Sequence, residues 1–382
     1  MFTLPEAFES FNDARKQGFI EVKNLKEQGR KVVGTYCVFT PWELIMAAGA
    51  IPVSLCGMSE EPIAEAERHL PRNLCPLIKS SYGFAVSDTC PYFYFSDMLV
   101  GETTCDGKKK MYEYLGELKP MHIMQLPPTN KGEMAFAYWR NEMLLFKQRL
   151  EQEFGVEITE EKLREAIRNR NDERRLLKEF YGLGAMEPPT MTGLQLLQVL
   201  YGSSFKLDRA VQKQELAALT ARLRKEYEEG ARPVSDKAPR ILVTGCPIGG
   251  ATEKIVRIIE ESGGVVVCFE SCSGAKGNDE LVDETIDPID ALTAKYLNTA
   301  CSCMSPNDNR LVLLSKLMEQ YRVAGVIDVV LQACHTYNVE THRVKKFVNG
   351  EKGIPYMSLE TDYSQSDMGQ LKTRISAFIE ML

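Results

Sequence analysis

Hydrophobic and polar positions follow two alternating patterns over the first third of the chain. Short continuous apolar runs predict buried strands, and three- to four-residue apolar spacing predicts helices at residues 41–49 and 107–119. Pro41 suits the first turn of the earlier helix. The predicted strands cover residues 31–36, 51–55, 92–95 and 122–126. Strands that alternate with helices in this way are typical of a parallel α/β sheet.

The pattern changes to long charged helices between about residues 131 and 230. Stretches such as residues 160–178 and 209–229 carry apolar positions three and four residues apart, which predicts a helical insert. Pro188, Pro189 and Gly202 are expected to break it into separate helices. Residues 231–239 contain two prolines and are predicted to form a linker.

A second α/β series follows this linker. Its predicted strands cover residues 240–244, 265–269, 325–331 and 355–359, and its predicted helices cover residues 252–262, 308–322, 339–349 and 367–381. Both halves repeat one plan of strand, cysteine-bearing turn and helix. We therefore expect two parallel-sheet α/β domains, at residues 1–130 and 236–382, joined by a helical segment at residues 131–235.

Composition narrows the possible partners and the cellular compartment. The formal net charge of −7 argues against nucleic acid or an anionic membrane as a partner, because both attract a basic face. The N-terminal residues lack the basic and apolar regions of a signal peptide, and no apolar run reaches the roughly 20 residues of a membrane span. We expect a cytoplasmic protein whose thiols remain reduced.

Eleven cysteines are the chemically most informative residues. A single Cys at a strand end is usually a small buried apolar residue, but most of these lie beside Gly or Pro in turns that follow predicted strands. No C-x-x-C pair occurs, which disfavours zinc ribbons, thioredoxin chemistry and bacterial-ferredoxin spacing. The pattern indicates metal ligands on separate loops, as in an iron–sulfur protein. The turn cysteines are Cys37, Cys75, Cys105, Cys246, Cys301, Cys303 and Cys334.

The other cysteines divide by context. Cys268 lies inside a predicted strand and is expected to be a core residue, and Cys272 occupies a turn where it would line a pocket without binding metal. Cys301 and Cys303 are two residues apart, so an extended segment would point both the same way, whereas a tight loop would present only one. The residues that fit either role are Cys56 and Cys90.

The glycine-rich loop at residues 245–250 precedes a predicted helix and admits two interpretations. Its amides could hold a phosphate or approach an inorganic sulfide. It lacks both the Lys-Ser/Thr of a P-loop and the G-x-G-x-x-G pattern. We expect no bound nucleotide and no ATP hydrolysis by this chain.

Two polar residues are candidate catalytic groups. Glu43 follows the Cys37 turn, near the expected strand ends where open α/β sheets collect their active sites. His335, next to Cys334, could deliver protons or donate a hydrogen bond to a sulfur, although a structural role is equally common for such a residue. Lys108, which follows Cys105, is expected to lie on a solvated helix start.

These motifs together resemble a known family. Residues 34–37, 41–44 and 47–53 are similar to the opening of the 2-hydroxyacyl-CoA dehydratase and benzoyl-CoA reductase subunits, and the resemblance runs nearly end to end. Within that family, the segments around four cysteines most resemble the double-cubane cluster proteins. Those cysteines are Cys75, Cys105, Cys246 and Cys334.

The resemblance implies two flavodoxin-like domains that hold metal in the cleft between them, with the helical segment supporting a homodimer. Dehydratase subunits hold one [4Fe-4S] cluster with three cysteines, which Cys75, Cys105 and Cys334 match. A double-cubane [8Fe-9S] cluster needs three more thiolates. The resemblance assigns these to Cys37, Cys246 and Cys303, with Cys301 as the alternative to Cys303.

The activity implied is that of an oxidoreductase: an iron–sulfur reductase component that accepts low-potential electrons from an ATP-hydrolysing [4Fe-4S] activator protein and reduces a small molecule. One alternative is a 2-hydroxyacyl-CoA dehydratase subunit with a single [4Fe-4S] cluster, an unlike partner chain and a CoA thioester. A second is a non-catalytic electron carrier. A third is a zinc-bound or metal-free α/β protein whose cysteines only fill space.

Overall fold

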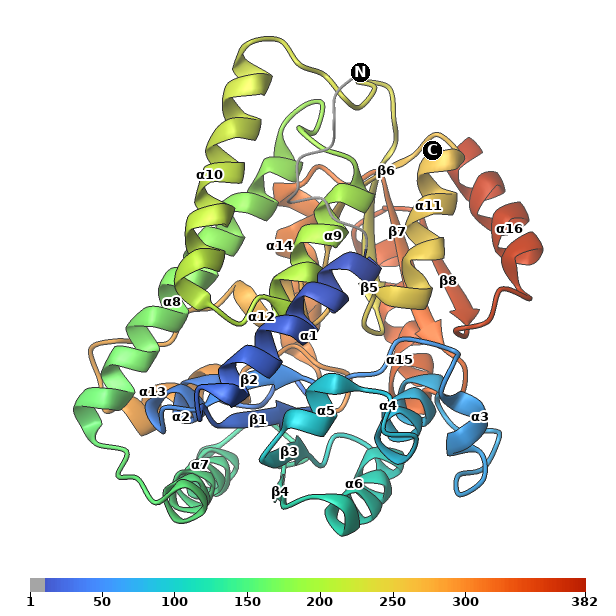
Figure 1. Ribbon diagram of the computed structural model, residues 1–382. Coiled ribbons are helices and arrows are strands. Elements are labelled where there is room, and N and C mark those ends of the chain that lie inside the picture. Colours follow the sequence, from blue (N-terminus) through green and yellow to red (C-terminus); the bar gives the residue numbers. More distant parts are fainter. Residues whose placement is uncertain (1–10) are drawn as a thin grey trace.

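The computed structural model describes residues 11–382 and contains two four-stranded parallel sheets (Figure 1). The first has the order β2-β1-β3-β4 and lies in the lower half of the view. Its two central strands, β1 and β3, are mostly apolar and buried along their whole length, as parallel strands covered by helices require. Their bounds are β1 Val32–Thr35, β2 Ile51–Ser54, β3 Met98–Glu102 and β4 Met121–Met124.

The predicted strand at residues 92–95 is wrong. These residues lie in a short helix, α5 (Pro91–Phe95), and the third strand of the sheet is β3. Pro91 opens α5 because its fixed φ suits a first helical turn and its missing N–H has no partner to lose there. Short apolar runs do not distinguish a buried strand from a buried helix, so the pattern alone placed the strand too early.

The second sheet has the order β6-β5-β7-β8, and all four of its strands were predicted. Both sheets reverse their strand order at one internal point, between β1 and β3 and between β5 and β7. The prediction of two parallel-sheet α/β units is confirmed. The strand bounds are β5 Arg240–Gly245, β6 Val265–Phe269, β7 Gly325–Leu331 and β8 Tyr356–Thr361.

Helices cover the faces of both sheets. The predictions missed α1, α4 and α13 and found most of the others. Around the first sheet they are α1 Phe11–Glu27, α2 Trp42–Ala47, α3 Ile63–Ala66, α4 Pro76–Val86, α5 and α6 Asp106–Leu118. In the second half they are α11 Glu253–Glu261, α12 Ala275–Asn278, α13 Pro288–Leu297, α14 Asp308–Gln320, α15 His335–Lys345 and α16 Met368–Glu380, with short turns η4 Gly250–Thr252 and η5 Lys346–Glu351.

The middle of the chain is helical as predicted, with breaks at Pro188–Pro189 and after Gly202. Thr192 begins α9 with a reciprocal capping box to Gln195. These helices form no core of their own: Trp139 of α7 packs into the core of the first sheet, and Leu196 of α9 into that of the second. Their bounds are α7 Glu133–Phe154, α8 Glu160–Gly182, η2 Leu183–Ala185, α9 Gly193–Gly202, η3 Ser203–Phe205 and α10 Arg209–Glu228.

The two halves share a buried cluster at their junction. Cys75 of the first half and Cys246, Leu331 and Tyr337 of the second belong to one apolar core. Ala251, in the loop after β5, donates its N–H to the carbonyl of Met58, in the loop after β2, at 2.9 Å. The carboxyl-end loops of both sheets therefore meet there. No helix within residues 11–382 combines the length and apolar character needed to cross a bilayer.

The packing of His122 makes stability depend on pH. Its ring stacks on Phe146 at 5.2 Å, and burial, with a smaller contribution from Arg149, lowers its pKa to about 4. The unfolded chain binds this proton near pH 6.5 whereas the folded chain does not. The contribution of His122 to the free energy of unfolding is therefore complete above about pH 6.5. It falls by about 2 kcal/mol as the pH drops toward 4.

His122→Leu should remove this component. The free energy of unfolding is measured in urea at about pH 7.5 and at about pH 4.5. Between these two pH values it should fall by about 2 kcal/mol less for the variant than for the wild type. His342→Leu, a change at an exposed histidine, is the control and should lose as much as the wild type. Identical losses for His122→Leu and the wild type would contradict the assignment.

Candidate metal centre

Four cysteines follow the four strands that flank the reversal points of the sheets. Cys37 comes two residues after β1, Cys105 three after β3, Cys246 directly after β5, and Cys334 three after β7. Open α/β sheets bind ligands at the carboxyl ends of these strands. Because both sets of ends meet at the junction, the topology brings thiols from both halves to one place.

The backbone around Cys246 and Cys334 fixes these two residues side by side. Gly245 has φ +104°, and a Cβ there would lie 2.2 Å from the carbonyl oxygen of Val329, so only glycine fits. Cys246 donates its N–H to that carbonyl at 2.7 Å, and Leu331 donates its N–H to the Cys246 Sγ at 3.3 Å. Ala333, just before Cys334, has φ +58°, a strained value for a residue with a side chain.

Three of the cysteines at the junction are helix N-caps. Cys75 precedes α4, Cys105 precedes α6 and Cys334 precedes α15. The first amides of a helix lack partners within the helix, and its dipole is positive at this end. Both effects favour a thiolate over a thiol. This local setting opposes the cost of burying sulfur charge.

We call the first set of neighbouring thiols the Cys334 group: Cys75, Cys105, Cys246 and Cys334. Hydrogen bonds from the Cys246 and Cys75 thiols lower the pKa of Cys334 to about 3. A hydrogen bond to Cys334 raises the pKa of Cys75. Burial, and then a hydrogen bond to Cys334, raise the pKa of Cys246. Burial raises the pKa of Cys105, and the charge of Cys334 adds to this effect. The structure therefore brings together the three cysteines expected to share one cluster.

A second set, the Cys301 group, contains Cys37, Cys272, Cys301 and Cys303. A hydrogen bond from Cys303 lowers the pKa of Cys301 to about 6. The same bond and burial raise the pKa of Cys303, and nearby Cys37 adds to the increase. Burial raises the pKa of Cys37 and brings that of Cys272 to about 11. Cys272 thus lies among these thiols, and Cys301 and Cys303 contact each other.

Cys246, which is expected to share a cubane with Cys37 and Cys303, lies beside Cys334 and Cys75. Cys268 lies in strand β6 and in the main core, as predicted. Cys56 donates to the carbonyl of Tyr36 at 3.2 Å, and Cys90 is buried as the N-cap of α5. All eleven cysteines are free thiols.

Two buried lysines face the thiols. Lys108 is not on a solvated helix face as expected: it donates to the carbonyl of Tyr36 at 2.7 Å, and although burial opposes its charge, Tyr112 and the thiols of Cys37, Cys56 and Cys105 raise its pKa. Lys276 donates to the Tyr337 hydroxyl at 2.5 Å and pairs with Glu270 at 3.1 Å. Each lysine therefore compensates negative charge on a nearby sulfur.

Sequence reasoning missed the polar network behind the Cys301 group. The Tyr337 hydroxyl lies 3.9 Å from the Cys301 Sγ, and Lys276 connects it to Glu270. Arg310, fully buried, contacts Glu270 at 3.7 Å and pairs with Glu340 at 2.6 Å. These residues come from separate helices and strands, and no spacing in the sequence brings them together.

The two candidate catalytic residues lie in different settings. Glu43 is fully buried, 2.7 Å from Arg174, and accepts a hydrogen bond from the Tyr296 hydroxyl at 2.7 Å. Burial raises its pKa, but Arg174 and Arg170 lower it further, so the carboxylate is held charged. This placement favours a positioning role for Glu43. His335 is exposed at the first position of α15.

The donor set fits a cluster better than a single ion. Within residues 11–382, no three His, Cys, Asp or Glu side chains converge closely enough to hold one metal ion. In an iron–sulfur cluster each thiolate binds a different iron, so the sulfurs do not converge on one point. Free, buried or half-buried thiols on separate loops, with helix-end amides and buried lysines beside them, have the chemistry that such a cluster requires.

These features define a two-sheet α/β protein that gathers cysteine side chains at the junction of its halves. Residues 37–382 match the family described as 2-hydroxyglutaryl-CoA dehydratase, D-component, and the chain belongs to this family. The family predicted from the sequence motifs is confirmed.

Relatives with assigned names are similar over nearly their whole length. YjiM of Escherichia coli K12, provisionally named a dehydratase subunit, is 57% identical over 379 residues, covering 99% of this chain and 98% of the relative. The (R)-phenyllactyl-CoA dehydratase beta subunit of Clostridium sporogenes is 24% identical over 365 residues, 94% of each chain. One of the benzoyl-CoA reductase subunits of Thauera aromatica is 21% identical over 367 residues, covering 93% and 92%.

The buried Glu43–Arg174 pair should be essential for stability. Glu43→Gln leaves the Arg174 charge buried with no ionised partner within reach, which should lower the free energy of unfolding by about 3 kcal/mol. Glu226→Gln, which removes an exposed pair with Arg222 at 3.8 Å, is the control and should cost less than about 1 kcal/mol. Equal losses in urea unfolding would show that the Glu43 pair contributes no more than a surface pair.

Proposed function

We propose that this protein is an iron–sulfur reductase component that holds a double-cubane [8Fe-9S] cluster at the junction of its two sheets. The observation that carries the proposal is the presence of two neighbouring groups of thiols, each drawn from both halves of the chain. The proposed ligands are Cys37, Cys75, Cys105, Cys246, Cys303 and Cys334, with Cys301 as the alternative to Cys303.

The second thiol group favours two cubanes over one. A single [4Fe-4S] cluster with three cysteines would leave the Cys301 group unused. Cys246 also adds a fourth thiol beside Cys75 and Cys334, where a three-cysteine cluster would keep an iron open for substrate. A dehydratase subunit with one cluster, which the names of the relatives favour, remains the second candidate. A non-catalytic electron carrier would hold the same cluster without turning over a substrate.

When bound, such a cluster would store electrons at low potential. The roles of the chain's own residues follow from their placement. The N-cap cysteines present sulfur to helix-end amides, and Lys108 and Lys276 offset the negative charge that the thiolates add. The apolar core around Cys75, Cys246 and Leu331 keeps water from the Cys334 group.

We propose two protein partners. One is an ATP-hydrolysing [4Fe-4S] activator protein that supplies electrons, which rests on the family resemblance, and the relatives are named as subunits of larger enzymes. The other is a second copy of the chain. Met134, Tyr138 and Leu145 expose apolar side chains along one face of α7, which is consistent with a homodimer through the helical segment. The substrate is proposed to be a small molecule.

Cysteine variants purified without oxygen test the proposal through iron content. The wild type should hold about eight irons per chain, and Cys37→Ala, Cys105→Ala and Cys246→Ala should each lower this number and the visible absorbance. Cys268→Ala, in the core away from both groups, is the control and should keep the wild-type value.

The same measurement separates the alternatives. About four irons in the wild type, unchanged by Cys37→Ala, would support the single-cluster dehydratase subunit. A colourless wild type, or equal loss of iron from Cys268→Ala and Cys246→Ala, would contradict the assigned ligands. With iron as proposed, absence of any reduced product when the activator and ATP are supplied would favour the electron carrier.

A further inference from the structure

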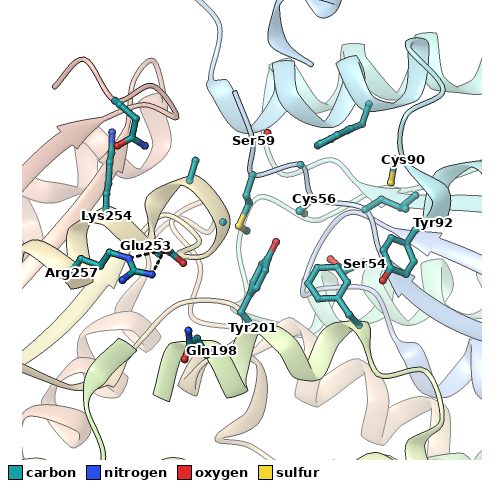
Figure 2. Close-up of a pocket in the computed structure, with 18 of the residues that line it drawn as sticks. Ser54, Cys56, Ser59, Cys90, Tyr92, Gln198, Tyr201, Glu253, Lys254 and Arg257 are labelled. Carbon is teal, nitrogen blue, oxygen red and sulfur yellow. Dashed lines mark hydrogen bonds and ion pairs between the residues drawn. The ribbon is translucent and has the colours of Figure 1, made fainter. Parts of the chain in front are cut away.

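Two cavities lie between the two halves of the chain, and residues of the helical segment line part of each. The larger, of about 560 Å³, lies between Cys56 and Tyr92 on one side and Glu253, Lys254 and Arg257 on the other (Figure 2). The smaller, of about 180 Å³, shares part of its lining with the first and reaches Cys37 and Cys272 of the Cys301 group. We call the smaller one the basic cavity.

The basic cavity has more positive than negative charge in its wall. Glu173 is the acidic residue among its lining and pairs with Arg170 at 2.5 Å and Arg209 at 3.3 Å. Arg174 pairs with Glu43 at 2.7 Å behind the wall. The cationic lining residues are Lys108, Arg170, Arg174, Arg209 and Lys295. Lys108 faces the thiols, so the other four cations remain for the cavity itself. The carboxylates that pair with them are those of Glu173 and Glu43.

Lys295 is the cavity cation with no ion-pair partner among the described residues. The residue is 93% buried, and its ammonium group lies 3.5 Å from the carbonyl of Gly277 and 4.3 Å from the centroid of the Tyr296 ring. Among residues 11–382, no carboxylate lies within 4 Å of its ammonium group. Burial, and then the charge of Arg174, lower its pKa well below the usual range. A buried cation of this kind is stabilised when an anion enters beside it.

The arginines are held in a geometry that suits a carboxylate. Arg170 and Arg209 lie over the Trp42 ring at 4.8 and 5.0 Å, which fixes both guanidinium groups in place. The Nη2 of Arg209 and the Nε of Arg174 are buried and have no hydrogen-bond acceptor among residues 11–382. Guanidinium groups with free N–H donors bind carboxylates in a directed, often bidentate, manner.

The wall also carries hydroxyl and amide groups, and one part of it is apolar. Leu177, Leu200 and Phe205 line it with carbon. A volume of about 180 Å³ has room for roughly six water molecules at about 30 Å³ each. A compact organic acid fits this space, whereas only the acyl end of a CoA thioester could enter.

Two lysines other than the four cavity cations lie beside the thiols. Lys108 donates to the carbonyl of Tyr36, next to Cys37, and Lys276 donates to the Tyr337 hydroxyl, which lies 3.9 Å from the Cys301 Sγ.

We propose that the basic cavity binds the carboxylate of a small organic acid between Lys295, Arg174 and Arg209, with its apolar part against Leu177, Leu200 and Phe205. The position of the cavity beside Cys37 makes this acid the substrate class of the reductase. That identification as a substrate rests on the proposed function, whereas carboxylate binding itself does not.

Calorimetric titration of the full chain, purified without oxygen, tests the proposal. The probes are benzoate and its neutral analogue benzamide, and benzoate should bind at least about tenfold more tightly. Lys295→Met and Arg209→Gln should each weaken benzoate binding by about 10- to 100-fold, because each removes a charged hydrogen bond in a buried site. Both should leave benzamide binding unchanged.

Arg222→Gln, on the same helix as Arg209 but exposed, is the matched control and should bind benzoate like the wild type. Equal binding of benzoate and benzamide would overturn the inference, as would wild-type affinity in Lys295→Met and Arg209→Gln. Failure of acetate, butyrate and benzoate to bind the wild type would also overturn it.

Iron and sulfide analysis of the same samples separates this inference from the proposed function. If the samples hold the expected iron and sulfide but do not bind benzoate, the carboxylate site is contradicted and the proposed function is not. Benzoate binding that depends on Lys295 in a chain without iron would support the anion site and contradict the reductase assignment.

Discussion

The carboxyl ends of the two parallel sheets face each other, and the rest of the structure depends on this arrangement. Each sheet delivers a cysteine from each strand at its reversal point, so Cys105 lies near Cys334 beside Cys246, and Cys37 lies in the Cys301 group. Burying so many thiols in apolar surroundings opposes their ionisation, as the raised pKa of Cys37 indicates. Helix-end amides and buried lysines reduce this cost locally, and they lie where the thiols are densest.

Two sets of buried cations have different surroundings at the junction. Lys108 and Lys276 face sulfur, and the latter belongs to a buried network with Tyr337. Lys295 and Arg209 line a separate cavity that is partly apolar. Glu43 pairs with Arg174 from behind and so fixes a cation at the cavity wall.

Much of the architecture was predictable because parallel strands are continuous apolar runs and helices have a distinct period. The four strands of the second sheet and the breaks at Pro188 and Gly202 were predicted for that reason. The failure at residues 92–95 arose because a short apolar run fits a helix as well as a strand. The neighbours of Cys246 depend on contacts across the junction, which no local pattern records.

The central claim is that both thiol groups bind the same inorganic cofactor. The most direct measurement is an anomalous difference map, recorded at the iron absorption edge from crystals grown without oxygen. The account predicts iron peaks beside the Cys334 group and beside the Cys301 group, close enough to belong to one cluster. Iron beside only one group, or beside neither, would contradict it.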